Sequence, residues 1–350
     1  MAPPRPSIAD LARHLNLACS TVSRALAQGP HVSAATRQRV RQLAEELHYQ
    51  PHEAAVALRK GHGRLLSVLV PHITGSFFPD VVDGITRAAS QAGYSVIVCP
   101  CWDDARQERD NLQLLVNFQV AGLLVAPTGS SCEVAHFEAL RPAGLPLVFF
   151  DRALDTLQGP GIGAVGADNY AGAYAAVRHL IEQGYRRIAH FAGPLHLDIY
   201  QHRQQGYRQA LLDHNLPCPP ELCCEIEQSQ VAGAAAMHQL LALPQRPDAV
   251  FSASDSVAAG ALQALKAAGL RIPHDVALVG FSNAHFTPLT EPPLTTVDPR
   301  GQRMGQQVVQ LLLRLLRPGG SLPPAPVLLS PQLLVRASSR RMDTPTQAAP

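Results

Sequence analysis

No segment of this sequence is long and apolar enough to cross a membrane. Its longest apolar runs, Leu65 to Val70 and Pro146 to Phe150, are far shorter than the roughly 20 residues that a transmembrane helix needs. The opening segment, Met1 to Pro6, is rich in proline and lacks the apolar core of a secretory signal. These absences predict a cytoplasmic protein with no membrane partner.

Zinc-binding motifs and a paired set of cysteines are also lacking. The seven cysteines include no pair of C-x-x-C motifs, and no histidine stands at zinc-finger spacing from them. His196, Asp198 and His202 carry ligand-type side chains, but their i, i+2, i+6 spacing defines no common face. We therefore expect no metal site, and interpret the cysteines as scattered thiols in a reducing compartment.

Enzyme motifs are missing or out of context. Neither a G-x-S-x-G elbow nor a P-loop occurs. Gly161 to Gly166 matches the dinucleotide fingerprint G-x-G-x-x-G, which needs a strand ending at the first glycine and a helix opening at the glycines. Here turn-like residues 155–160 precede the run, and a helix is expected only after Asp168. We expect no catalytic residues and no cofactor; a nicotinamide-dependent dehydrogenase is the alternative, which a cofactor titration would test.

Charge is present but unevenly distributed. The net charge is +2, yet residues 1–60 carry eight basic and four acidic side chains, so the remaining 290 residues sum to −2. A basic head on a faintly acidic body favours a polyanion-binding module attached to another unit. With 46% hydrophobic residues in a chain of 350, the sequence predicts two or three globular domains.

Three short helices are predicted at the front of the chain. Ser7 to Asp10 reads as a capping box, followed by apolar residues at helical spacing up to Leu15. After a turn at residues 16–18, a second helix should face inward with Val22 and Leu26. Its outward side chains are expected to be Cys19, Ser20, Ser23 and Arg24. Ser33 can cap a third helix. The pattern alone fits either a DNA-binding unit or a plain three-helix bundle with a solvated basic face.

Residue identities favour the first interpretation. Ile8 to Ala12 (IADLA), Leu17 to Leu26 (LACSTVSRAL) and Glu46 to Pro51 (ELHYQP) closely resemble the headpiece of the lactose-repressor (LacI/GalR) family, with Thr21 to Arg24 the most diagnostic part. The resemblance implies that the residues facing the major groove are Cys19, Ser20 and Arg24. It implies that the residues near phosphates are Thr21, Ser23, His31, Ser33 and Thr36.

Arg24 is the best candidate base reader, because a guanidinium can bind O6 and N7 of guanine together. Ala18 departs from the family, which usually has a capping serine there, and such a loss costs about 1 kcal/mol. Residues 51–62 form a helix-capable linker between a proline and a glycine. In the family this hinge folds on operator DNA, and the resemblance implies that Leu58 wedges into the minor groove. An ordinary linker leucine is the alternative.

Behind the hinge, short β-rich runs alternate with helical patterns, which predicts an α/β fold with parallel sheets. The expected strands are residues 65–70, 95–99, 122–126, 147–150, 188–192, 249–252 and 276–280. Their number fits two lobes of doubly wound sheet rather than one. Because open α/β sheets bind ligands at the carboxyl ends of their strands, a ligand site is expected at that edge.

The family resemblance continues to about Ser339, for example in Asp168 to Gly172 (DNYAG) and Pro293 to Val297 (PLTTV). It implies two lobes like those of periplasmic sugar-binding proteins, joined by chain crossings near residues 162, 292 and 320. The implied domains are a headpiece (1–50), a hinge (51–62), lobe one (63–162 and 293–319), lobe two (163–292 and 320–339) and a flexible tail (340–350). A stand-alone solute-binding protein would share the body but would need an export signal and no headpiece.

A small-molecule effector is implied between the lobes. The implied contacts are Ile73, Phe77, Arg203, Ser254, Asp255 and Ser282. An arginine fork suits a carboxylate, phosphate or diol, and an acid suits sugar hydroxyls, so a sugar, sugar acid or nucleoside-like molecule is expected. A surface salt bridge is the alternative for Arg203. Ser282 stands where many relatives have an acid, and Gln228 where sugar-binding members often have an aromatic residue.

Taken with these residues, the resemblance implies a sequence-specific transcriptional regulator, most often a repressor in this family, and not an enzyme. Two-fold symmetry would let the headpieces of a homodimer read inverted half-sites of operator DNA. Residues 342–350 lack the leucine heptads with which the lactose repressor tetramerises, which favours a dimer. Effector binding should change operator affinity, and by linkage DNA should change effector affinity by the same factor.

Overall fold

The computed structural model describes residues 6–49, 63–129, 135–140, 144–152, 162–323 and 325–341. The chain divides into two compact units, residues 1–63 and 64–350, and each has its own hydrophobic core. In the described ranges, no helix combines the length and apolar character that a bilayer crossing requires.

The first unit is a bundle of three helices. They are α1 (Ile8–Leu15), α2 (Cys19–Leu26) and α3 (Ala34–Glu46). The predicted capping box is confirmed, because the Ser7 hydroxyl accepts the Asp10 N–H and the Asp10 carboxylate accepts the Ser7 N–H. Ser33 caps α3, but Ala18 at the start of α2 makes no side-chain hydrogen bond. Helix α2 therefore depends on packing for its order.

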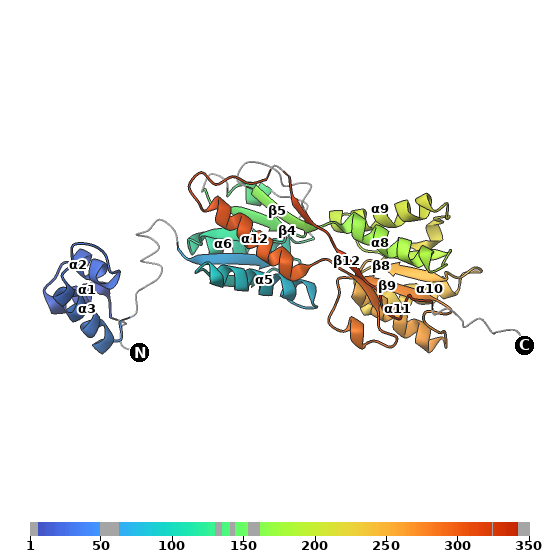
Figure 1. Cartoon of the computed structure of the whole chain (residues 1–350), viewed down its shortest axis with the longest axis horizontal. Coiled ribbons are helices and arrows are strands. Elements are labelled where there is room, and N and C mark those ends of the chain that lie inside the picture. The colour runs from blue at the N-terminus through green and yellow to red at the C-terminus, as the bar shows by residue number, and fades with distance from the viewer. Residues whose placement is uncertain are drawn as a thin grey trace, which may run out of the picture. The chain divides into compact units, whose positions relative to one another are not determined.

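The first lobe of the second unit, which carries β4 and β5 in Figure 1, is built on a parallel sheet. Its strand order is β11-β5-β4-β3-β1-β2. Its strands are β1 (Leu65–Val70), β2 (Ser95–Pro100), β3 (Gly122–Val125), β4 (Leu147–Phe150), β5 (Ile162–Ala167) and β11 (Val327–Leu329). Helices α5 (Phe77–Gln91) and α12 (Gly301–Leu315) pack on one face, and α6 (Ala105–Asn117) and α7 (Ala135–Glu138) on the other. Coverage of both faces explains why the central strands are almost wholly apolar.

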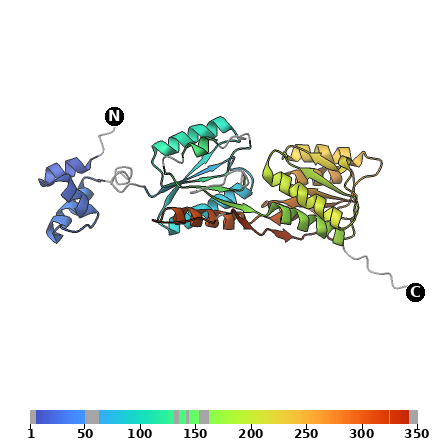
Figure 2. The ribbon, with the colours of Figure 1, turned by 90° about the horizontal axis from the view of Figure 1, so that it is seen from above.

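The second lobe repeats this plan with the order β12-β10-β9-β8-β6-β7. Its strands are β6 (Ile188–Ala192), β7 (Cys223–Glu225), β8 (Ala249–Ser252), β9 (Ala277–Phe281), β10 (Thr295–Asp298) and β12 (Gln332–Leu334). Helices α8 (Asn169–Glu182) and α9 (Asp198–Asp213) cover one face, and α10 (Gln230–Leu241) and α11 (Asp255–Ala267) the other (Figure 2). Short 3-10 turns lie at η2 (Pro220–Leu222) and η3 (Thr287–Leu289). Only the pairing of β10 with β12 is antiparallel among the described strands.

The predicted strands are confirmed to within one residue at either end, but the glycine-rich run was not recognised as a strand. It forms β5, which pairs with β4 and β11. A Cβ at Gly163 would lie 3.2 Å from Leu322 Cδ1, so close packing explains the small residue there. The apparent dinucleotide fingerprint is therefore a buried strand.

The predicted crossing points between the lobes are wrong by several residues. The chain leaves a lobe after Ala167, after Asp298 and after Leu329, at the ends of β5, β10 and β11, rather than near 162, 292 and 320. Each of these strands is hydrogen-bonded to a neighbour in its own sheet, so the chain cannot cross before the strand ends. All three crossings therefore follow the carboxyl end of a strand.

Candidate functional site

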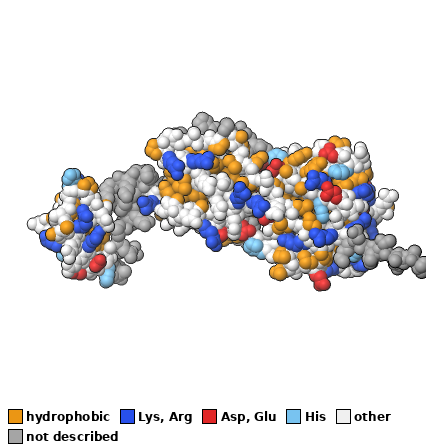
Figure 3. Space-filling model, in the orientation of Figure 1, with side chains coloured by type: hydrophobic (Ala, Val, Ile, Leu, Met, Phe, Trp, Pro, Cys, Tyr) orange, Lys and Arg blue, Asp and Glu red, His pale blue; other side chains and the backbone are white. Residues whose placement is uncertain are grey.

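The exposed face of α2 carries most of the residues predicted to read DNA. Cys19, Ser20 and Arg24 are exposed, and Thr21 is half-buried. Ser20 and Arg24 are one helical turn apart and share a face. Basic side chains also lie on the surface of the first unit in Figure 3. These side chains are the donors that phosphates and base edges accept.

Ser23 does not face outward as predicted. It is 8% exposed, and with Val22 and Ala25 it forms the inner side of α2 against the other helices. The buried face of α2 is wider than the two positions Val22 and Leu26 predict, because it also includes Ser23 and Ala25. Ser23 lies at the edge of this face and is covered by the neighbouring helices.

The start of α3 gathers the predicted phosphate contacts outside α2. The Ser33 and Thr36 hydroxyls lie 2.8 Å apart, and Ser33 also accepts the Thr36 N–H. His31 is exposed and has a φ of 64°. Arg37, which the sequence reasoning gave no role, donates to the carbonyls of Gly29 and Val32 and fixes this loop. Leu58 lies outside the described residues.

A cavity of about 200 Å³ lies between the lobes, at the carboxyl ends of the strands where a ligand site was predicted. Five of the predicted effector residues line it, namely Phe77, Arg203, Ser254, Asp255 and Ser282. Ile73 does not, and it is 48% exposed. Its neighbours His72 and Thr74 line the cavity.

Arg203 is the most completely buried cation of the second-lobe wall. Its Nε donates to Asn169 Oδ1 at 2.9 Å and its Nη1 to the Ala253 carbonyl at 2.7 Å. The guanidinium carbon lies 3.8 Å from the centre of the Phe281 ring. Burial lowers the pKa of Arg203, and the nearby Tyr200 and Asp151 oppose this effect. The surface salt bridge considered as its alternative role is excluded, because Arg203 is 6% exposed.

Arg152 occupies the opposite wall and was missed as a site residue. Its Nη1 donates to Asp103 Oδ1 at 2.7 Å, while its buried Nε has no partner in the described part of the chain. Burial alone would raise the pKa of Asp103, but the charge and hydrogen bond of Arg152 outweigh burial and lower it. Asp151 and Arg152 follow β4 directly, so the strand-end rule could have identified them.

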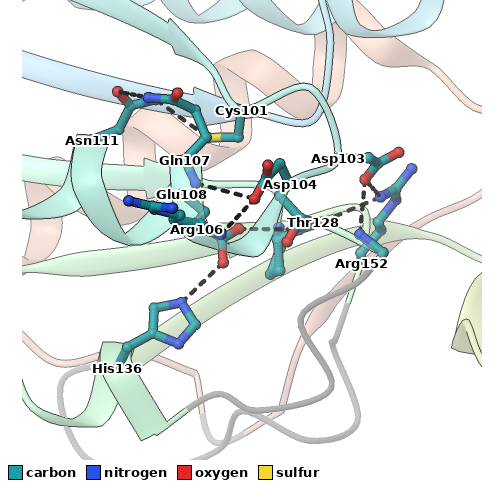
Figure 4. Close-up of polar contacts among 12 residues, drawn as sticks. Cys101, Asp103, Asp104, Arg106, Gln107, Glu108, Asn111, Thr128, His136 and Arg152 are labelled. Carbon is teal, nitrogen blue, oxygen red and sulfur yellow. Dashed lines mark hydrogen bonds and ion pairs between the residues drawn. The ribbon is translucent and has the colours of Figure 1, made fainter.

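Two carboxylates hold the loop after β3 beside this pair (Figure 4). Glu108 accepts the Thr128 N–H at 2.7 Å, and Asp103 accepts the Gly129 N–H at 2.8 Å. His136 Nε2 lies 2.9 Å from the other oxygen of Glu108. His196 Nε2 of the second lobe lies 3.1 Å from the Gly129 carbonyl oxygen, so this loop contacts the second lobe.

The carboxylate of Asp255 is used mainly in hydrogen bonds within the protein, which leaves it little capacity to bind a ligand. Its carboxylate accepts the Ala284 N–H and the Thr296 hydroxyl, each at 2.7 Å. Burial raises the pKa of Asp255 to about 6, although these hydrogen bonds favour the charged form. A Cβ at Gly280 would collide with the Asp255 carboxylate. Asp255 therefore ties the segments after β9 and within β10 to the start of α11.

Gln228 gives the second-lobe wall an acceptor. Its Nε2 donates to the carbonyls of Ile226 at 3.0 Å and Ala192 at 3.3 Å, which fixes the orientation of the amide. Its Oε1 is buried without a partner among the described residues, and the side chain lines the cavity. The site thus offers an amide oxygen at the position where, by the family resemblance, sugar-binding members often have an aromatic residue. A ligand can satisfy this oxygen with an N–H or O–H group.

Comparisons with known proteins cover both units. Residues 7–52 match the profile of bacterial regulatory proteins of the lacI family, and residues 177–339 match a periplasmic binding protein-like domain. Over 333 residues the chain is 34% identical to the HTH-type transcriptional repressor CytR of Escherichia coli (strain K12), covering 95% of this chain and 96% of CytR.

Two solved structures are similar over nearly the whole chain. The lac repressor dimer bound to operator and the anti-inducer ONPF has a TM-score of 0.84 at 26% identity and covers 97% of this chain and 100% of its own. The transcriptional regulator CelR–cellobiose complex has a TM-score of 0.72 at 30% identity and covers 95% and 100%. The similarity therefore extends through the headpiece and both lobes.

Proposed function

Because the chain belongs to the lacI family of bacterial regulatory proteins, we propose that it represses transcription from operator DNA under the control of a small polar molecule bound between its lobes. It is a DNA-binding transcriptional regulator and not an enzyme. The observation that carries the effector proposal is the cavity lined by both lobes, with two buried guanidiniums on opposite walls. The protein acts in the cytoplasm, where its operator is found.

The DNA-reading surface is the exposed face of α2 with the start of α3. Arg24 reads a base in the major groove, with Cys19 and Ser20 beside it. The phosphate contacts are Thr21, His31, Ser33 and Thr36, and Leu58 of the hinge wedges into the minor groove. The exposure of Arg24 and the positive end of α3 beside Ser33 support this assignment. Ser23 is not part of the surface.

The effector is a molecule that accepts hydrogen bonds from arginine and donates one to Gln228. Sugars, sugar acids and nucleosides have both kinds of group. Because such a ligand contacts both lobes, its binding changes their relative angle and hence the operator affinity of a homodimer. The contact between His196 and the Gly129 carbonyl joins residues of the two lobes, which supports the proposal that the angle between the lobes changes when a ligand binds.

A ligand screen on the full-length protein tests the effector proposal. Sugars, sugar acids, nucleosides and purines are screened by thermal shift, and each hit is added to an operator-binding titration on DNA selected from a random pool. Trp102 is the only tryptophan and is 62% exposed beside Asp103, so its fluorescence offers a second readout. We expect at least one hit to change operator affinity. If hits bind but none alters operator affinity, the effector role is wrong.

The variant Arg24→Ala tests DNA reading separately. Losing one bidentate base contact should weaken selected DNA by about 10- to 100-fold while leaving random DNA nearly unchanged. Arg39→Ala removes an exposed arginine of α3 outside the proposed surface and is the matched control. An equal loss on both DNAs would remove the base-reading role of Arg24.

A further inference from the structure

Two cysteines of the second lobe face each other away from the effector cavity. The Sγ atom of Cys218 lies 3.8 Å from the Sγ atom of Cys223. Cys218 is exposed and follows α9, whereas Cys223 is half-buried and opens β7. The 3-10 turn η2 lies between them and folds the chain back, so that the two thiols meet. Neither cysteine has a part in the proposed DNA-reading surface or effector site.

The space around the two thiols gives a small oxidant access to them. Both cysteines line a cavity of about 640 Å³, together with Arg208 and Leu216. A disulfide has sulfur atoms about 2.05 Å apart, so the two sulfurs must approach by roughly 1.7 Å, which small side-chain rotations can supply. The Cys223 thiol also contacts the Tyr207 hydroxyl at 3.9 Å. Burial raises the pKa of Cys223 to about 11, and the exposed Cys218 is the thiol that a dissolved oxidant reaches first.

We propose that Cys218 and Cys223 are a redox-modification site, at which hydrogen peroxide closes a reversible intramolecular disulfide. The Cys218 thiolate attacks one peroxide oxygen, the O–O bond breaks, and the departing hydroxide takes up the thiol proton as water. The sulfur of Cys223 then displaces the hydroxyl group of the Cys218 sulfenic acid, which leaves as water with the Cys223 proton. Two thiols and one peroxide become one disulfide and two waters, and an added dithiol reverses the reaction.

The disulfide is detected in the full-length protein under native conditions. Reduced protein is treated with hydrogen peroxide, remaining thiols are alkylated, and endoproteinase Glu-C cleaves after Glu221 and Glu225. This cleavage separates Cys218 from the fragment 222–225, which carries Cys223 and Cys224. A disulfide keeps the two fragments joined, with a mass about 2 Da below the sum of the reduced fragments.

Three serine variants identify the partner. We expect joined fragments from the wild type and from Cys224→Ser, which dithiothreitol separates, and none from Cys218→Ser or Cys223→Ser. Joined fragments from Cys223→Ser at the wild-type yield would assign the disulfide to Cys224 and overturn the proposal. So would a wild type in which Cys218 is converted to sulfinic or sulfonic acid without any joined fragments. Because the wild type and Cys224→Ser retain both reacting thiols, the result does not depend on how well the other variants fold.

Discussion

The cavity between the lobes is lined by two buried arginines that are held in different ways. Arg152, on the first lobe, is paired with the carboxylate of Asp103, which is itself 43% exposed. Arg203, on the second lobe, donates to an amide oxygen and a peptide carbonyl and lies on an aromatic ring. Both hydrogen-bond acceptors of Arg203 are neutral, while the charges of Asp151, Asp255 and Asp198 favour its charged form. The comparison indicates that Arg152 already has a direct anionic partner, whereas a ligand can supply one to Arg203.

The variant with the largest expected effect is Arg203→Ala. Hydrogen bonds to a charged group are worth about 1.5 to 3 kcal/mol, so affinity for a screened effector should fall by about 10- to 150-fold. Operator affinity without effector should stay within about twofold. Isothermal titration and operator binding measure the two effects.

Arg208→Ala, an exposed arginine on the same helix, is the control and should change neither quantity. A normal effector response in Arg203→Ala would exclude Arg203 from the binding site.

The second lobe should also be the more sensitive to pH. Burial raises the pKa of Asp255 from 3.8 to about 6, so its contribution to stability is present below pH 3.8 and is lost as pH rises through 6. Burial lowers the pKa of His190 from 6.5 to about 4, so its contribution is present above pH 6.5 and is lost as pH falls through 4. As pH rises from 4 to 6.5, Asp255 therefore lowers the free energy of unfolding while His190 raises it.

The variant Asp255→Asn should expose the effect of His190 alone. The local free energy of unfolding of β8 to β10 should then rise by about 3 kcal/mol from pH 4 to pH 6.5, more steeply than in the wild type. Hydrogen exchange, corrected for intrinsic rates, measures this difference. Equal pH slopes in variant and wild type would contradict the raised pKa of Asp255.

The pair on the first-lobe wall should show a smaller energy. A double-mutant cycle with Arg152→Ala and Asp103→Asn, measured on effector affinity, should give a coupling of about 1 kcal/mol, because the exposed side of Asp103 is screened by water. The exposed pair Arg87 and Asp83 on α5 is the control, with a coupling near zero. If this coupling energy exceeded the loss of effector binding energy in Arg203→Ala, the first-lobe wall would be the stronger one and the comparison between the walls would be reversed.

The smallest effect is expected at the contact between the lobes. His196→Ala removes a single hydrogen bond to the Gly129 carbonyl and should weaken effector binding by about two- to fivefold. His238→Ala, an exposed histidine on α10, should have no effect. Loss of effector affinity equal to that of Arg203→Ala would show that closure, rather than charge, dominates binding.

The local pattern of apolar residues was sufficient to predict many of the strands. Strands such as β1 and β4 were predicted because nearly every residue in them is apolar and buried. Strand β5 was missed because its sequence, IGAVGA, is rich in small residues, which are required by the packing of Leu322 and other distant side chains. Predicting β5 therefore requires knowledge of tertiary packing that the local sequence pattern does not contain.

The site could be predicted where it depends on strand ends, and not where it depends on long-range pairing. Arg203 and Ser254, which family motifs mark, do line the cavity. The ion pair of Asp103 with Arg152 joins positions 49 residues apart, and no local spacing indicates it. Ile73 and Ser23 were misplaced because the direction of a side chain at the edge of a loop or helix face is decided by its neighbours.

The position of the chain crossings has a consequence for biosynthesis. Helix α12, which covers one face of the first sheet, begins at Gly301, and the edge strand β11 ends at Leu329. The second sheet receives its last strand, β12, only at Gln332. Neither lobe can complete its core on the ribosome until almost the whole chain has been made. A premature stop before α12 would leave apolar residues such as Leu66 and Leu124 uncovered, so truncated chains should aggregate rather than accumulate as a folded single lobe.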